Sequence, residues 1–299
     1  MSRSSWQAPS LASLLAGTAT IAAIVITQPA MAKTAREVAQ IAIPTTVRID
    51  NALGNNYGGS GVIIARRGKT YTVLTANHVV NNNSTEYSIY TSRKKSYPVQ
   101  SVVNLQRSES DPDLAIVIFE TSDEYPVAPI SDSDEATIGS GIYISGYPQS
   151  IESNGEREYE FTAGQVTSRP SSRANGYTLR YDAVTRRGMS GGPVFDVSGR
   201  VVGIHGQGDR SGVVQEASGG TEEIKTGLNA AVPINLFRAS SRGAGVEVAS
   251  LKIDDKPPDN VEAVTPPKEE VRGWFDNFAI GVGIGIIQRV VPRVPGFRF

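Results

Sequence analysis

Residues 185–194, Thr-Arg-Arg-Gly-Met-Ser-Gly-Gly-Pro-Val, constrain the fold of this chain more than any other stretch. They place one serine, Ser190, among glycines in a tight turn and follow the turn at once with strand-forming residues. Glycines on both sides of a serine let the backbone approach a substrate closely and turn its N–H groups outward. We therefore expect a turn that presents a nucleophile and hydrogen-bond donors together, as acyl transfer requires.

A serine hydroxyl is a weak nucleophile and needs a base within hydrogen-bond reach. The sequence offers two histidines, His78 and His205. Asp113 begins an apolar run at residues 114–119 that is typical of a buried strand. A carboxylate at the mouth of such a strand can orient an imidazole and stabilise its charged form. Asp111 is a competing acid, which we expect in a loop because a proline separates it from Asp113.

The order His78, Asp113, Ser190, in the motifs T-A-x-H, D-L-A and G-x-S-G-G-P, resembles the trypsin-like (chymotrypsin-fold) serine proteases. The resemblance covers residues 36–243. It implies that Ser190 is the nucleophile, His78 the general base and Asp113 the orienting acid. It also implies that the backbone N–H groups of Gly188 and Ser190 form the oxyanion hole.

Two other interpretations of these motifs are open. The turn also matches G-x-S-x-G, the nucleophile elbow of α/β-hydrolases, in which the histidine comes last in the chain after an acid. Only His205 follows Ser190, fifteen residues on, which leaves no room for the intervening strands and helices. Each motif alone also fits an ordinary turn, a strand start or a structural histidine, but their combination in this order favours catalysis.

The residues around the turn predict a pocket for acidic side chains. Val184 stands six residues before Ser190, where trypsin has the acid that selects basic side chains. Thr185 and His205 resemble the pair that binds a substrate carboxylate in bacterial glutamyl endopeptidases, and a hydroxyl and an imidazole can donate to a carboxylate. The alternative is that His205 is a buried strand residue, hydrogen-bonded inside the second barrel.

The chain that follows His205 is expected to bind the substrate backbone. Gly206, Gln207 and Gly208 would form an edge strand to which an extended peptide adds by β-augmentation. Residues 209–226 are rich in glycine, serine and charge, which predicts a long loop over the pocket. Residues 227–233 would return as a strand.

Short apolar runs separated by turn signals predict an all-β protein. We expect two six-stranded antiparallel β-barrels, the trypsin-like serine protease fold, with the active site between them. Barrel 1 would span about residues 36–130 and barrel 2 about residues 131–243. The expected strands are 47–49, 59–64, 70–75 and further runs to residue 119, then 141–145, 161–167, 178–182, 193–197, 201–205 and one around residue 228. Residues 36–43 would form a short helix or strand, and residues 234–239 a short helix.

The first 32 residues predict a secretory signal peptide. They hold Arg3, an apolar run and an Ala-Met-Ala cleavage site before Lys33. The alternative, an uncleaved membrane anchor, is disfavoured because the run is shorter than the roughly 20 residues of a membrane span.

Beyond the signal peptide we expect three regions. A trypsin-like protease domain would occupy residues 33–250. Residues 251–272 are rich in proline and acidic residues and predict a disordered linker. Residues 273–299 form a short apolar and basic tail, for which membrane association has weak support and a loosely packed end is favoured.

Composition excludes several classes of function. The formal net charge is −1, from 29 basic and 30 acidic residues, and no basic stripe indicates a nucleic-acid partner. The absence of cysteine excludes a thiol nucleophile, and the scarcity of histidine leaves no zinc-type metal site. Asp132 and Asp134 are expected in a solvated loop rather than at a metal.

The sequence thus predicts an exported serine endopeptidase, periplasmic or secreted, acting without a cofactor on protein or peptide substrates. We expect a monomer. The alternatives are a non-catalytic peptide-binding or scaffold protein on the same fold, and a cell-envelope interaction protein whose tail carries the function.

Overall fold

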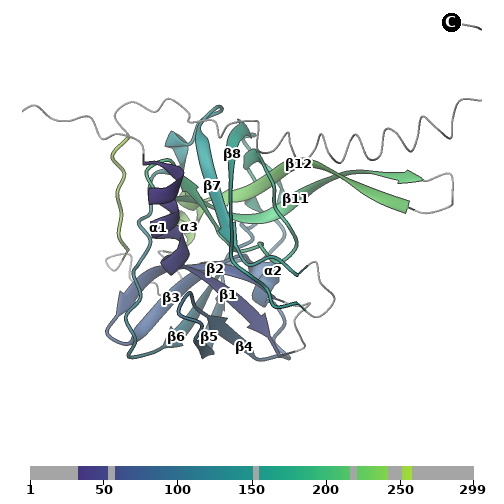
Figure 1. Ribbon diagram of the computed structural model, residues 1–299. Helices are drawn as coiled ribbons and strands as arrows, with labels where there is room; N and C mark the ends of the chain where they lie inside the picture. The colour runs from purple at the N-terminus through teal and green to yellow at the C-terminus, as the bar shows by residue number, and fades with distance from the viewer. Residues whose placement is uncertain (1–32, 53–57, 151–154, 216–220, 242–250, 258–299) are drawn as a thin grey trace, which may run out of the picture.

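The computed structural model describes residues 33–52, 58–150, 155–215, 221–241 and 251–257 (Figure 1). Within these ranges the chain forms two closed antiparallel β-barrels of six strands each. The first barrel, purple to blue in Figure 1, lies below the second, teal to green. The predicted all-β, two-barrel fold is therefore confirmed.

The first barrel closes in the order β1-β2-β3-β6-β5-β4. Burial alternates along β4, where Tyr87 and Ile89 are buried and their neighbours are not, whereas seven consecutive residues of β2 are buried. Tyr71 and Phe119 fill its centre with their rings stacked at 5.2 Å. Its strands are β1 (Thr46–Asn51), β2 (Gly58–Arg67), β3 (Thr70–Thr75), β4 (Tyr87–Tyr90), β5 (Ser96–Asn104) and β6 (Ala115–Glu120).

The second barrel closes in the order β10-β11-β12-β9-β8-β7. Its strands are β7 (Gly141–Gly146), β8 (Glu160–Ser168), β9 (Leu179–Ala183), β10 (Pro193–Asp196), β11 (Val201–Gln215) and β12 (Thr221–Pro233). Strands β11 and β12 continue past the barrel as a long ribbon (Figure 1). The prediction of a long loop at residues 209–226 is therefore wrong for most of that stretch, because antiparallel pairing satisfies its backbone despite the loop-like composition.

Helices flank the barrels. Helix α1 (Ala35–Thr45) begins with a capping box between Thr34 and Glu37 and precedes the first barrel. Helix α3 (Ile234–Ser241) follows β12, as predicted. The short helices are α2 (Asn77–Val80), η1 (Ser133–Glu135) and η2 (Ala174–Gly176). Among the helices of the described ranges, none has the length and apolar character that a membrane crossing requires.

A single apolar cluster joins the two barrels and both long helices. Its members come from α1, from strands of both barrels and from α3, and all are buried. Representative members are Val38, Ile64, Leu114, Phe195, Ile204 and Phe237. Because this cluster is shared, the two barrels pack as one body and can hold the two halves of a site in register.

Residues 251–257 pack on the barrels instead of forming the start of a disordered linker. The N–H of Ile130 donates to the carbonyl of Lys252, and the N–H of Asp254 donates to the carbonyl of Ile130, each at 2.8 Å. Leu251 is buried in the shared apolar cluster, which gives this segment its anchor. The remaining linker residues, 258–272, lie outside the described residues, as do the predicted signal peptide, 1–32, and the tail, 273–299.

Candidate active site

The register of the first barrel brings His78 and Asp113 together. Strands β3 and β6 pair with Thr75 opposite Ala115, so the end of β3 lies beside the start of β6. His78 follows β3 in helix α2, and Asp113 precedes β6. The Asp113 carboxylate accepts from the His78 backbone N–H at 2.9 Å and lies 2.6 Å from Nδ1 of the imidazole. Two contacts to one carboxylate fix both the position and the rotation of the ring.

The Asp113 carboxylate is buried and ionised. Burial would raise its pKa, but the hydrogen bonds and charge of His78, together with a hydrogen bond from Tyr177, lower the pKa below its usual value. An ionised carboxylate can only accept. The Nδ1 of His78 therefore carries the proton, and Nε2 of the neutral ring is left to act as a base.

Tyr177 is a contact that the sequence analysis missed. It follows η2, and its hydroxyl donates a short hydrogen bond to the same Asp113 oxygen that contacts His78. Burial, and next the Asp113 charge, raise the pKa of Tyr177, so the phenol stays protonated and remains a donor. No local motif marks this tyrosine, because it lies far from Asp113 in the chain.

Ser190 sits in a turn between β9 and β10. Gly188 and Gly191 adopt positive φ angles of 96° and 85°, which only glycine adopts readily. The Ser190 carbonyl accepts from the N–H of Ser60 at 2.7 Å, so the first barrel holds the turn directly. A β-carbon on Gly191 would lie 2.1 Å from Oγ1 of Thr75 and 3.1 Å from the nitrogen of Ala76. The turn thus abuts the residues that lead into α2.

The Ser190 hydroxyl donates to the Gly206 carbonyl at 3.5 Å. Among the described residues it makes no hydrogen bond to His78. Gly59 lies between the serine turn and α2, since a β-carbon there would be 2.6 Å from both the Ser190 carbonyl oxygen and a methyl of Val79. The structure therefore joins His78 to Asp113 directly and places Ser190 beside them, a separation common in unliganded sites.

The N–H groups of Gly188 and Ser190 point away from the protein's own acceptors. In the described part of the chain, neither donates an internal hydrogen bond. The carbonyl of Arg187 accepts from the N–H of Gln149 at 2.7 Å, which fixes the peptide that carries the Gly188 N–H. Two unpaired donors at one turn can bind a developing oxyanion.

The predicted pocket residues do not contact each other: Thr185 follows β9, His205 lies in β11, and β12 stands between these two strands. Thr185 donates to Oδ1 of Asn229 at 2.5 Å, and Nδ1 of His205 lies 2.7 Å from the Tyr181 hydroxyl. Asn229 and Tyr181 are partners across the β12–β9 pair. His205 is buried, as its structural interpretation also predicts. Burial, followed by the nearby charge of His78, lowers its pKa to about 4, although a hydrogen bond with Ala230 raises it in part.

Gly206, Gln207 and Gly208 belong to β11. On one side, Gln207 and Gly208 pair with Ala230 and Asn229 of β12. On the other side, β10 pairs only with residues earlier in β11, so this stretch has no second strand partner in the described ranges. Gln207 and Gly208 are exposed. The backbone edge is open to an extended peptide.

A surface pocket of about 540 Å³ opens beside His78. Its floor includes Gln106 and Asn175, which are hydrogen-bonded to each other at 2.8 Å. The lining residues are His78, Gln106, Arg107, Ser108, Glu109, Asp113, Ala174 and Asn175. Sequence analysis did not identify this pocket, since its two walls come from loops of different barrels.

The competing acids have local structural contacts. Asp111 accepts from the N–H groups of Arg107 and Ser108 and shapes its own loop. Asp132 caps η1 by accepting from the N–H of Asp134 at 2.8 Å. The described residues contain no group of three or more acidic or histidine side chains that could hold a metal ion.

Comparison with known proteins agrees with this geometry. Residues 59–204 match the family model of the trypsin-like peptidase domain. A probable periplasmic serine endoprotease, DegP-like, from Hahella chejuensis is 30% identical over 181 residues, which cover 60% of this chain and 33% of that protein. The serine protease Do-like HtrA of Bacillus subtilis is 30% identical over 159 residues, covering 49% of this chain and 32% of that protein.

The chain thus spans about a third of the length of these relatives. The matched segment runs from β2 to β11 and includes His78, Asp113 and Ser190. Residues 59–204 are thus similar to the trypsin-like peptidase domain, and the two closed six-stranded barrels are consistent with the trypsin-like fold.

Proposed function

We propose that this protein is an exported serine endopeptidase that hydrolyses peptide bonds through an acyl-enzyme. Ser190 is the nucleophile, His78 the general base and Asp113 the acid that orients it. The observation that carries this proposal is the buried Asp113 carboxylate that holds Nδ1 of His78 at 2.6 Å beside the glycine turn of Ser190. This arrangement leaves Nε2 free to accept a proton.

In the first half of the reaction, the Ser190 oxygen attacks the scissile carbonyl carbon and its proton passes to Nε2 of His78. The N–H groups of Gly188 and Ser190 bind the oxyanion of the tetrahedral intermediate. The carbon–nitrogen bond then breaks, and the leaving amine takes the proton from His78. In the second half, water attacks the acyl carbon as His78 takes its proton. The bond from the acyl carbon to the Ser190 oxygen then breaks, His78 returns the proton to that oxygen, and the acid product leaves.

The substrate lies along the open edge of β11. Its backbone pairs with Gly206, Gln207 and Gly208, which have an unpartnered side in the described ranges. The finer proposal is a preference for glutamate, and less often aspartate, before the cleaved bond. Thr185 and a neutral His205 would then donate to the carboxylate at the base of the pocket.

Export and partners follow from the same proposal. The residues before Lys33 have the features of a signal peptide, and the relatives from Hahella chejuensis and Marinomonas are named as periplasmic. The partners are protein or peptide substrates, the enzyme works as a monomer, and the chemistry needs no cofactor.

A second candidate is a non-catalytic peptide-binding protein on the same fold. It is favoured by one observation, the hydrogen bond from the Ser190 hydroxyl to Gly206 instead of His78. Such a protein would keep the open β11 edge and bind peptides without cleaving them. The third candidate, a cell-envelope interaction protein acting through residues 273–299, predicts lost localisation but intact peptidase activity when that tail is deleted.

Covalent labelling separates the enzyme from the binding protein. A serine-directed fluorophosphonate should label the wild-type chain once, at Ser190, as located by mass spectrometry of the digested adduct. Ser190→Ala and His78→Gln should not react, because one lacks the nucleophile and the other the base. Labelling that is absent from the folded wild type, or that persists in Ser190→Ala, would reject the catalytic role.

A further inference from the structure

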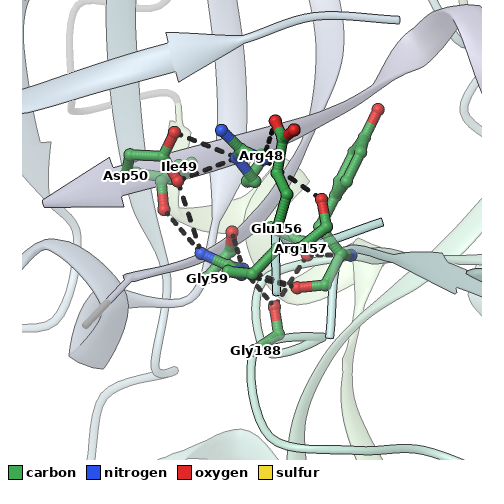
Figure 2. Close-up of polar contacts among 9 residues, drawn as sticks. Arg48, Ile49, Asp50, Gly59, Glu156, Arg157 and Gly188 are labelled. Atoms are coloured by element: carbon green, nitrogen blue, oxygen red, sulfur yellow. Dashed lines mark hydrogen bonds and ion pairs between the residues drawn. The ribbon is translucent and has the colours of Figure 1, made fainter. Parts of the chain in front are cut away.

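A buried arginine lies where the two barrels meet behind the serine turn. Arg157, in the loop between β7 and β8, is 5% exposed. Its guanidinium donates to four backbone carbonyls from four separate segments (Figure 2). The donor–acceptor distances are 3.3 Å to Ile49, 2.8 Å to Gly59, 2.6 Å to Tyr147 and 3.0 Å to Gly188. The guanidinium thus bridges β1 and β2 of the first barrel to the second barrel and its catalytic turn.

The guanidinium is a charged group that is buried among backbone carbonyls. Burial lowers the pKa of Arg157 to about 10, Asp50 opposes this shift, and Arg48 adds to it. The group therefore stays protonated at neutral pH. Its nearest carboxylate, on Asp50, is 3.6 Å away and is shared with Arg48 at 2.9 Å. Burying a charge that is held mainly by carbonyls is costly, which suggests a purpose beyond packing.

The contact with Gly188 fixes the orientation of the turn. Its carbonyl accepts from Arg157 and also from Oγ of Ser60 at 2.9 Å. On the other side of the same residue, the Arg187 carbonyl is held by the N–H of Gln149 at 2.7 Å. Because N–H and C=O point in opposite directions across a trans peptide, the Gly188 N–H faces away from Gln149. Both peptides flanking Gly188 are therefore locked.

The conformation and surroundings of residue 188 favour glycine. Gly188 has a φ of 96°, and a β-carbon there would meet the Tyr147 carbonyl at 2.8 Å and Nη2 of Arg157 at 3.2 Å. A glycine peptide rotates more freely than any other, so the turn needs an external hold to keep its N–H groups aimed at the substrate. Arg157 and Ser60 restrain the turn by donating hydrogen bonds to the Gly188 carbonyl.

We propose that Arg157 is a positioning residue that holds the Gly188–Met189 peptide, which links the two peptides that carry the N–H groups of Gly188 and Ser190, so that both N–H groups face the substrate carbonyl. Arg157 touches no substrate and acts through Gly188. This inference rests on the proposed peptidase function. It predicts that loss of the guanidinium weakens binding of the oxyanion while leaving substrate binding nearly unchanged.

The test replaces Arg157 by methionine, which removes the charge and all donors, and by lysine, which keeps the charge but not the planar fork. Arg200→Met is the matched control. Arg200 is also a buried arginine, 4% exposed, that binds Asp196 and the carbonyl of Asp254, but it does not contact the turn. All three variants and the wild type are made as full chains and checked for cooperative thermal unfolding.

Two measurements are read together on the best-cleaved peptide of a mixed library. The first is kcat and KM. The second is a ratio of two inhibition strengths, that of a peptide aldehyde divided by that of the corresponding alcohol. The aldehyde forms a hemiacetal with Ser190 and uses the oxyanion hole, whereas the alcohol does not. Loss of one oxyanion donor costs about 10²–10³ in kcat. We expect Arg157→Met to lose about 10² in kcat and in the aldehyde-to-alcohol ratio, with KM within about threefold.

Arg157→Lys should have a kcat and an aldehyde-to-alcohol ratio between those of Arg157→Met and the wild type. Arg200→Met should lose stability without losing kcat. The inference is overturned if Arg157→Met keeps kcat and the aldehyde ratio within threefold of Arg200→Met. Should Arg157→Met fail to fold, an unchanged aldehyde ratio in folded Arg157→Lys overturns it as well. A wild type that neither cleaves peptides nor reacts with a fluorophosphonate contradicts the proposed function itself. That result differs from a loss of activity that is confined to the Arg157 variants.

Discussion

The hydroxyl of Tyr177 occupies the space that a side chain on Gly206 would need. A β-carbon built on Gly206 would lie 2.3 Å from that oxygen. The same hydroxyl donates to Asp113, and the Gly206 carbonyl accepts from Ser190. A tyrosine from the second barrel thus completes the environment of a carboxylate in the first, and glycine at position 206 is what makes room for it.

Gly206→Ala should therefore destabilise the protein and lower its activity. Overpacking of this kind costs about 1–3 kcal/mol, which for a domain of this size lowers Tm by roughly 2–4 °C per kcal/mol. Gly208→Ala is the matched control in the same strand, since its β-carbon would have 3.6 Å to the nearest atom, Oδ1 of Asn229. Thermal unfolding of both variants checks this. Equal losses of Tm in the two variants would show that the crowding at Tyr177 has no effect.

Tyr177→Phe should reduce kcat/KM by about tenfold, because hydrogen bonds to charged groups contribute about 1.5–3 kcal/mol and part of this holds Asp113 against His78. Steady-state kinetics on a peptide substrate measure it. Tyr71→Phe serves as the control. That hydroxyl is also buried and hydrogen-bonded, to the carbonyl of Asp123, but lies in the first barrel away from the site. If both variants keep kcat/KM within twofold of the wild type, the Tyr177 contact does not contribute to catalysis.

His205 should make stability depend on pH. Its pKa in the folded protein is about 4, because burial disfavours the charged ring, whereas an unfolded histidine titrates near 6.5. The unfolded chain therefore binds a proton between these values that the folded chain does not. The corresponding stability, about 3 kcal/mol, is fully present above pH 6.5 and is lost as the pH falls toward 4.

Urea unfolding of the wild type and of His205→Gln at several pH values between about 7.5 and 4 isolates this contribution from the many carboxylates. The free energy of unfolding should fall more steeply with acidification in the wild type than in the variant. Parallel curves would mean that the ring is not held in its neutral form by burial.

Cleavage specificity tests the pocket separately from the catalytic residues. The wild type should cleave a mixed peptide library after glutamate at least tenfold faster than after glutamine, because a carboxylate gains charge-assisted hydrogen bonds in the pocket. Thr185→Val should reduce this ratio while retaining cleavage, since it removes the hydroxyl that is proposed to donate to the substrate carboxylate and that donates to Asn229 in the structure. Cleavage after small or apolar residues instead would contradict the proposed preference for acidic residues. It would not contradict the proposed role of Ser190 as nucleophile.

Short apolar runs and turn residues predicted both barrels. Strand β4 alternates between buried Tyr87 and Ile89 and half-buried neighbours, whereas β2 and β7 are nearly continuous buried runs. Amino-acid composition predicted the structure less well in segments whose strands are paired by backbone hydrogen bonds alone. The ribbon of β11 and β12 has the glycine, serine and charge of a loop, yet Val213 and Glu223 lie opposite each other as paired residues, despite shifts of register earlier in the pair. Residues 251–257 likewise gain order from Ile130, which no local pattern reveals.

Within the site, His78, Asp113 and Ser190 could be predicted because short motifs mark them. Tyr177 and Arg157 could not, because each acts across a barrel boundary through a contact that only the fold creates. Tyr177 resembles an ordinary aromatic core residue in the sequence. Arg157 lies in a charged stretch, Gly-Glu-Arg-Glu, that is typical of a solvated loop, yet its side chain is 4% exposed.

The central claim is that Ser190 cleaves peptide bonds with His78 as its base. The most direct test is the time course of cleavage of a mixed peptide library by the full wild-type chain and by Ser190→Ala, analysed by mass spectrometry. Ser190→Ala should fold as the wild type does, because the change removes one oxygen from a half-buried side chain. We expect cleavage by the wild type and a loss of at least 10³-fold in rate in the variant. Equal cleavage by both proteins, or none by a folded wild type, would contradict it.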